Sequence, residues 1–186
     1  MAVLGGLIAA AVYFAMVYNN LVQLKHNVSK AWANIDVLLK QRHDELPKLI
    51  ETCRQYMKFE QDTLTRVMAA RSQVFAARET RNMPALGQAE AALRSTVGNL
   101  LAVAEAYPEL KTNETFLQLQ ARIVSLESAI ADRREFYNES ANISNVRIEQ
   151  FPDVVVASLL AFKPAPLLHF AAADKADVDM RQAFTA

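Results

Sequence analysis

Cysteine, glycine and net charge are all scarce in this chain of 186 residues. Its one cysteine excludes an internal disulfide framework and every zinc or iron–sulfur site built from several cysteines. Its four glycines are too few for a phosphate-binding loop, a dinucleotide-binding fingerprint or the many tight turns of an all-β fold. The 20 basic side chains balance the 20 acidic ones, whereas a nucleic-acid-binding domain is usually basic. The composition therefore favours an all-α protein of modest size and predicts no nucleic-acid partner.

Charged side chains are absent from residues 1–24, and Lys25 is the first in the chain. An apolar run of this length can cross the hydrocarbon core of a bilayer as one helix of about 20 residues. The alternatives are a buried soluble helix and a cleaved signal peptide, which usually has basic residues before a shorter apolar run. No basic residue precedes this run, so we predict a transmembrane anchor over residues 1–24. The candidate membrane-facing residues are Leu4, Leu7, Ile8, Val12, Tyr13, Phe14 and Tyr18.

Basic residues close to the apolar run set its expected orientation. Lys25, Lys30, Lys40 and Arg42 follow the run, and only the amino terminus precedes it. Basic flanks of membrane spans tend to stay in the cytoplasm. We therefore expect the N-terminus outside and the body of the protein in the cytoplasm.

Apolar residues recur every three or four positions after the anchor, a heptad spacing typical of packed helices. The spacing predicts that the transmembrane helix continues as a long amphipathic helix to about Ala77, with a kink or a break at Pro47. Further helices are expected over residues 84–104 and 114–148, because a proline suits a first helical turn and an asparagine suits an N-cap. Residues 25–150 are thus predicted to form an antiparallel three-helix bundle that resembles a coiled coil.

Residues 151–186 differ from the bundle in composition. Residues 154–162 are strongly apolar but too few to span a bilayer. We expect them to form a short helix that docks on the bundle or on a neighbouring subunit rather than entering lipid. Residues 171–186 are small or charged and are predicted to be a mobile tail.

No catalytic, cofactor-binding or metal-binding residue stands out. His43–Glu45 are neighbours on a helix and point in different directions, whereas helical metal ligands lie three or four positions apart. Cys53 falls on the apolar stripe without a nearby histidine, so we interpret it as a small buried residue rather than a nucleophile. Trp32 is interpreted as a core residue close to the membrane.

A polar group interrupts the apolar stripe of the last long helix, where Arg133 and Tyr137 share a face. The group comprises Arg133, Arg134, Tyr137 and Asn138, and its candidate partners on the first helix are Asp36, Asp44 and Glu45. Buried polar groups need partners and can fix helix register. The group is therefore either a registry element or a surface that binds a partner protein or a lipid headgroup. The turn at Tyr107–Pro108 is similarly either a stop signal between helices or a binding loop.

Several ordered strings resemble the LemA family of bacterial membrane proteins. They include Tyr18–Val22, Asp44–Pro47, Ala102–Lys111, Arg133–Asn138 and Phe151–Pro152. The resemblance extends from Val17 to about Phe162 and implies one N-terminal span and a helical cytoplasmic body, and it supplies no catalytic residues that could be carried over to this chain. Glu45 departs from the family pattern, which commonly has an apolar residue there. A related branch resembles proteins that form intracellular magnetosome membranes, which makes membrane organisation a hypothesis.

Two functional hypotheses follow. The first is a non-enzymatic, single-pass protein of the bacterial cytoplasmic membrane that self-assembles or scaffolds partners. The alternative is a signalling or regulatory membrane protein that binds a dedicated partner through its helical body. The expected partners are membrane lipid, further copies of the chain and an unidentified protein, and no cofactor is expected.

Overall fold

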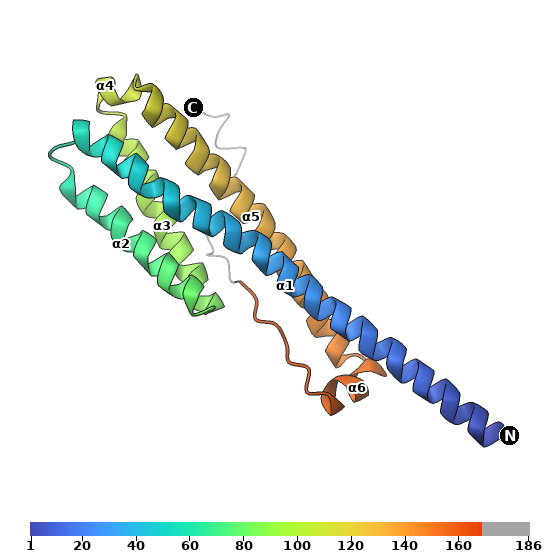
Figure 1. Ribbon diagram of the computed structural model, residues 1–186. Coiled ribbons are helices and arrows are strands. Elements are labelled where there is room, and N and C mark those ends of the chain that lie inside the picture. Colours follow the sequence, from blue (N-terminus) through green and yellow to red (C-terminus); the bar gives the residue numbers. More distant parts are fainter. Residues whose placement is uncertain (169–186) are drawn as a thin grey trace, which may run out of the picture. The chain divides into compact units, whose positions relative to one another are not determined.

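The computed structural model of the protein describes residues 1–168, and these form six helices without a strand (Figure 1). The predicted all-α fold is confirmed. The described residues divide into two compact units, and α1 and α5 contribute to both. The predicted mobile tail, residues 171–186, lies outside the described residues.

The first helix, α1 (Ala2–Tyr56), is continuous for 55 residues and contains Pro47. The break considered at Pro47 is therefore wrong. A proline removes one backbone hydrogen bond from a helix. Leu46 and Leu49, on either side of it, are fully buried. Tertiary packing of an apolar face contributes more to helix stability than local propensity does, so the helix is retained.

The predicted continuation of this helix to Ala77 is also wrong, because α1 ends at Tyr56 and α2 (Gln61–Glu79) begins after a turn. Within the turn, Met57 is fully buried and Phe59 is exposed. The apolar stripe resumes in α2 with Leu64 as its first buried residue. Four helices of 19 residues or more are thus present where three were expected.

The unit that contains residues 50–116 is built around α2 and α3 (Met83–Ala104), which pack against each other. Helix α3 begins as predicted, with a proline in its first turn and the Asn82 side chain accepting a hydrogen bond from the Ala85 amide at 3.1 Å. A short helix, α4 (Pro108–Lys111), follows. The Asn113 side chain accepts from the Phe116 amide at 2.9 Å, which confirms the predicted start of the next long helix.

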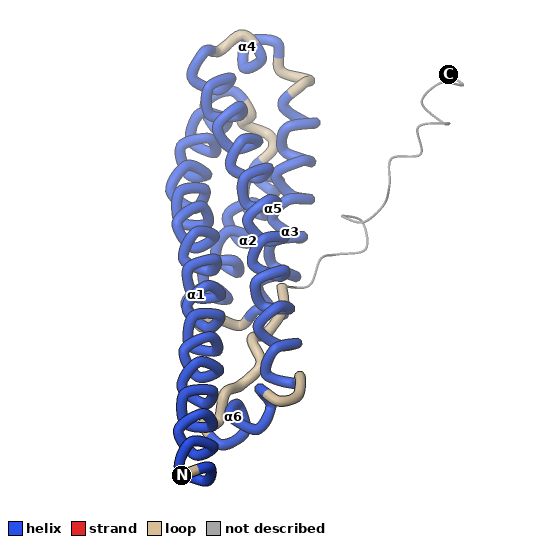
Figure 2. Tube along the Cα trace, turned by 90° about the vertical axis from the view of Figure 1, so that its right-hand side faces the viewer, coloured by secondary structure: helices blue, strands red, loops and turns tan. Residues whose placement is uncertain are grey.

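The other unit combines residues 1–49 of α1 with residues 117–149 of α5 (Glu114–Glu149) and with α6 (Asp153–Leu159). Here α1 and α5 lie side by side (Figure 1; Figure 2). Trp32 contacts Tyr137, and Arg42 pairs with Glu127. Because the position on α5 falls as that on α1 rises, the two helices are antiparallel. An extended segment, residues 162–167, follows α6 and is called the strap below.

Candidate functional site

The first part of α1 has little protein around it. Within residues 1–168, α1 is the one helix long and apolar enough to cross a membrane; its best 18-residue window has a mean hydropathy of 1.8 and is 6% buried. A core helix of a soluble protein would be mostly buried. The residues predicted to face the membrane are all exposed: Leu4, Leu7, Ile8, Val12, Tyr13, Phe14 and Tyr18. An apolar surface of this extent is typical of contact with lipid or with another protein.

Protein cover on α1 begins at Val17. Val17 and Leu21 are buried in a small cluster with Val156 and Ala157 of α6. Ile148 of α5 and Phe162 of the strap are packed against this cluster. The Tyr18 ring meets the Phe162 ring edge to face, with centroids 6.5 Å apart. Residues of the apolar run thus contact α6 directly.

The polar group of α5 divides between the two sides of the helix. Tyr137 and Arg134 are buried, at 2% and 8% exposure, and Asn138 is half-buried. Arg133 is exposed. Arg133 and Tyr137 lie one turn apart on α5, and the edge of its buried face runs between them, so that Arg134 is the buried arginine of the group.

Tyr137 binds two segments of its own unit. Its ring meets Trp32 of α1 edge to face at 6.1 Å, and its hydroxyl donates to the Pro166 carbonyl of the strap at 2.8 Å. Burial raises the pKa of Tyr137, so the hydroxyl keeps the proton that it donates. One predicted residue thus joins α1, α5 and the strap.

Asn145 provides a second attachment for the strap that the sequence did not reveal. Its side-chain amide donates to the Ala165 carbonyl at 2.9 Å and accepts from the Ala165 amide at 2.7 Å. The prolines on both sides of Ala165 favour an extended backbone, whose polar groups need partners outside the segment. Asn145 lies eight positions after Tyr137, which corresponds to about two helical turns on one face. This spacing was the sequence signal that could have grouped Asn145 with Tyr137.

Two of the carboxylates expected to pair with the polar group lie in ion pairs within α1. Asp44 pairs with Lys40 at 2.8 Å and Glu45 pairs with Lys48 at 3.1 Å, both within α1. Glu45 is only half-buried, so a charged residue is accommodated where the family resemblance led us to expect an apolar one. Between α1 and α5, the buried Arg42 pairs with the half-buried Glu127 at 3.9 Å.

The turn at Tyr107–Pro108 is tied to neighbouring turns of the same unit. The Tyr107 hydroxyl donates to the Glu60 carboxylate at 3.5 Å, and the Asn113 side chain donates to the Tyr56 hydroxyl at 3.1 Å. Desolvation, followed by the negative charge of Glu60, raises the pKa of Tyr107. Pro108 itself is exposed. The turn is ordered by contacts and retains an exposed side.

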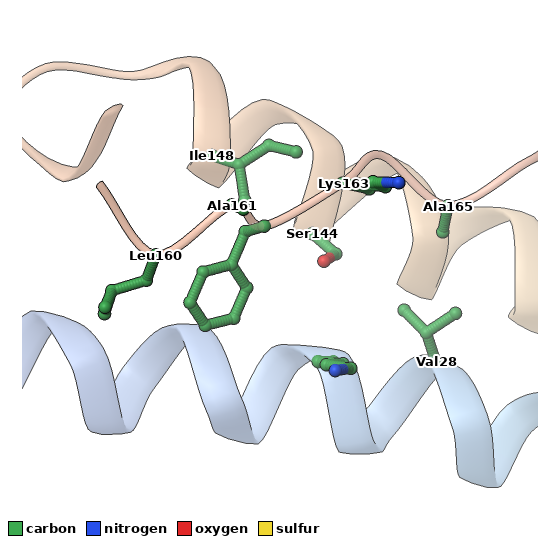
Figure 3. Close-up of a pocket in the computed structure, with 9 residues that line it drawn as sticks. Val28, Ser144, Ile148, Leu160, Ala161, Lys163 and Ala165 are labelled. Carbon is green, nitrogen blue, oxygen red and sulfur yellow. The ribbon is translucent and has the colours of Figure 1, made fainter. Parts of the chain in front are cut away.

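A cavity of about 290 Å³ lies between α1, α5 and the strap, and Figure 3 shows its labelled lining residues. Its described lining is mainly apolar, with Lys25, Lys163 and Ser144 as the polar side chains and without a carboxylate or a histidine. Across residues 1–168 no three His, Cys, Asp or Glu side chains are grouped to hold a metal ion.

Cys53 is expected to resist alkylation in the native protein. Its side chain is fully buried, and burial raises the pKa of the thiol to about 11. At pH 8 only about one thiol in a thousand would be the reactive thiolate. In a Ser95→Cys variant, which adds an exposed thiol, intact-mass spectrometry should find one maleimide adduct in buffer and two in denaturant. Equal labelling rates for the two thiols in buffer would contradict this expectation.

Comparisons with known proteins find similar sequences over different shares of the chain. Protein LemA of Metamycoplasma hominis is 26% identical over 161 residues, which are 87% of this chain and 73% of that protein. Magnetosome protein MamQ 2 of Paramagnetospirillum magneticum is 35% identical over 81 residues, which are 44% of this chain and 30% of that protein. Magnetosome protein MamQ of Magnetospirillum gryphiswaldense is 32% identical over 85 residues, 46% and 31% of the two chains.

The match to each of these magnetosome proteins thus spans less than a third of its length. The family comparison covers far more of the chain, because the model of the LemA family matches residues 31–181. On the extent of that match, the chain belongs to the LemA family.

Proposed function

We propose that this protein is a non-enzymatic scaffold of the bacterial cytoplasmic membrane, anchored by α1 and assembled through its helical body. The apolar N-terminal helix and membership of the LemA family together support a membrane-anchored protein. The observation that carries the proposal is the contrast within α1, whose residues 2–16 are all exposed while Leu21, Ile35 and Leu39 are buried. Basic residues beyond the apolar run favour a cytoplasmic body with the N-terminus outside.

The outer side of α5 supports assembly between copies. Phe136 and Ile143 are each 49% exposed and lie one heptad apart, and Val146 beside them is 42% exposed. Apolar side chains at this spacing are the usual seam between packed helices. Pairing of this seam with a second copy would remove it from water.

Sequence similarity to two magnetosome proteins favours membrane organisation as the process that the scaffold serves. A signalling or regulatory protein with a dedicated partner is the second candidate. The ordered turn at Tyr107–Pro108, with Pro108 exposed, is the observation that favours it.

Self-assembly predicts disulfide cross-linking between copies through α5. An Ile143→Cys variant, oxidised in native membranes, should give a discrete dimer on a non-reducing gel. The matched control is Asn34→Cys, at an exposed position on the adjacent α1, which should cross-link far less. In intact cells the Asn34→Cys thiol should also resist a membrane-impermeant maleimide, because we place it in the cytoplasm.

A strictly monomeric Ile143→Cys protein in membranes and across detergents would contradict self-assembly. The partner hypothesis then makes its own prediction, which is tested at Arg133, the exposed arginine of the polar group on α5 that was the other candidate binding surface. Because Arg133 is exposed, an Arg133→Ala change should abolish capture of the partner without altering helicity. Tyr137 is unsuitable for this test, since its burial makes any substitution a change of stability as well.

A further inference from the structure

Helix α6 has one side packed on protein and one side without cover. Val156 and Ala157 are buried against α1. On the other side, Val155 is 60% exposed and Leu159 is 71% exposed, and Phe151 just before the helix is 84% exposed. The docking predicted for this segment thus accounts for only part of its apolar side chains. Three of the most exposed apolar side chains, Phe151, Val155 and Leu159, are called the apolar patch below.

The contacts between α6 and α1 define the position of α6 along α1. Val17 and Leu21, the α1 residues in the shared cluster, fall within the uncharged run that ends at Leu24. A span of about 20 residues counted back from Leu24 includes both of them. Helix α6 therefore lies beside the last part of the span.

Charged groups near α6 are arranged as at a membrane boundary. The only ionisable residue of α6 is Asp153, which is 2% exposed and paired with Arg147. Lys25 and Lys163 line the cavity beyond α6, where Figure 3 shows Lys163 on the strap, and Arg147 and Glu149 are exposed at the end of α5. An apolar surface followed by lysines is the order of groups that a protein presents from acyl chains to headgroups.

We propose that α6 is a second membrane-contacting element, which lies in the interfacial region with Phe151, Val155 and Leu159 against lipid. The proposal rests on the membrane anchoring proposed above. The occupant of the patch is the leaflet from which α1 leaves the membrane, because α6 packs on Val17 and Leu21 within the span, and Lys25 and Lys163 follow beyond it. Short helices with one apolar side bind membranes in this way, at the boundary between headgroups and acyl chains.

Depth-dependent fluorescence quenching tests the proposal with the full chain reconstituted in phosphatidylcholine–phosphatidylglycerol vesicles. An environment-sensitive maleimide dye is attached to Leu159→Cys, to Val12→Cys in the span, or to Ser128→Cys, which is exposed on α5 about 30 Å before its C-terminal end. Cys53 is buried and serves as the unlabelled background. Lipids that carry a nitroxide near the headgroup or near the acyl-chain end act as shallow and deep quenchers.

We expect the shallow quencher to reduce Leu159→Cys emission several-fold more than that of Ser128→Cys, and the deep quencher to act most on Val12→Cys. Quenching at Val12→Cys with none at Leu159→Cys would overturn the interfacial role of α6 and leave the anchor intact. Absence of quenching at both would overturn the anchor. Self-cross-linking of Leu159→Cys without lipid quenching would assign the patch to a second copy and would also overturn the proposal.

Discussion

Arginine at both Val12 and Met16 is expected to transfer the protein from the membrane to the soluble fraction. Each arginine near the centre of a span costs about 2.5 to 3.5 kcal/mol on the insertion scale, so the pair costs about 5 to 7 kcal/mol. The corresponding change in partitioning is on the order of ten-thousand-fold. Carbonate extraction followed by ultracentrifugation and immunoblotting measures it.

The same substitutions should leave the helical body intact. Val12 and Met16 are 50% and 64% exposed, so no core contact is lost. Far-UV circular dichroism of the released protein should therefore retain the helicity of the parent, and a Val12→Ala, Met16→Ala control should stay in the membrane. A double-arginine variant that resists carbonate extraction would show that something other than α1 holds the protein there. An N-terminal tag retained on the membrane-bound parent separates an anchor from a cleaved signal peptide.

Alanine at Tyr137 should be the most destabilising single change on α5. Removal of a buried aromatic side chain costs about 3 to 5 kcal/mol, and here it also breaks the contact with Trp32 and the hydrogen bond to the strap. Tyr137→Phe removes only the hydrogen bond and should cost about 1 kcal/mol. Urea unfolding in detergent, followed by the fluorescence of Trp32, the single tryptophan, reports both.

Arg133→Ala is the matched control, because this exposed neighbour should change the free energy of unfolding by about 0.5 kcal/mol or less. A pH series adds an independent readout. Burial raises the pKa of Tyr137, so its contribution is complete below about pH 10 and declines at higher pH, where the unfolded chain loses the proton first. The Tyr137→Phe variant has no ionisable hydroxyl at this position, so its stability should lack this part of the decline at high pH. Equal stability of the parent and Tyr137→Ala would contradict the contacts described for the ring.

Local signals predicted the ends of several helices correctly. Pro84 and Asn113 act at helix starts through their backbone and capping chemistry, which the sequence alone specifies. The turn after Tyr56 was missed because no glycine or proline lies between Pro47 and Pro84, and because the apolar spacing resumes in α2. The helix-breaking effect of Pro47 was overestimated for the opposite reason. The free-energy cost of the proline is local, while the packing that offsets this cost comes from other parts of the chain.

The candidate site was predicted in outline and not in detail. Heptad spacing indicated a polar interruption around Tyr137, but a rotation of a fraction of a turn decides which arginine is buried, and that rotation depends on packing against α1. The partner of Asn145 lies 20 positions away on the strap. A contact between residues so far apart in the sequence depends on how α6 turns the chain back toward α5. No local sequence pattern encodes that path.

The continuity of α1 has a consequence for bilayers of different thickness. Transmembrane helices adapt to a thicker or thinner hydrocarbon core chiefly by changing their tilt. Here one uninterrupted helix holds both the apolar run and buried residues as far as Leu49, without a glycine or a turn between them. A change of tilt in the span is therefore carried directly into the unit formed by α1, α5 and α6, so that, in the proposed assembly, hydrophobic mismatch would set the angle at which the outer side of α5 meets a neighbouring copy.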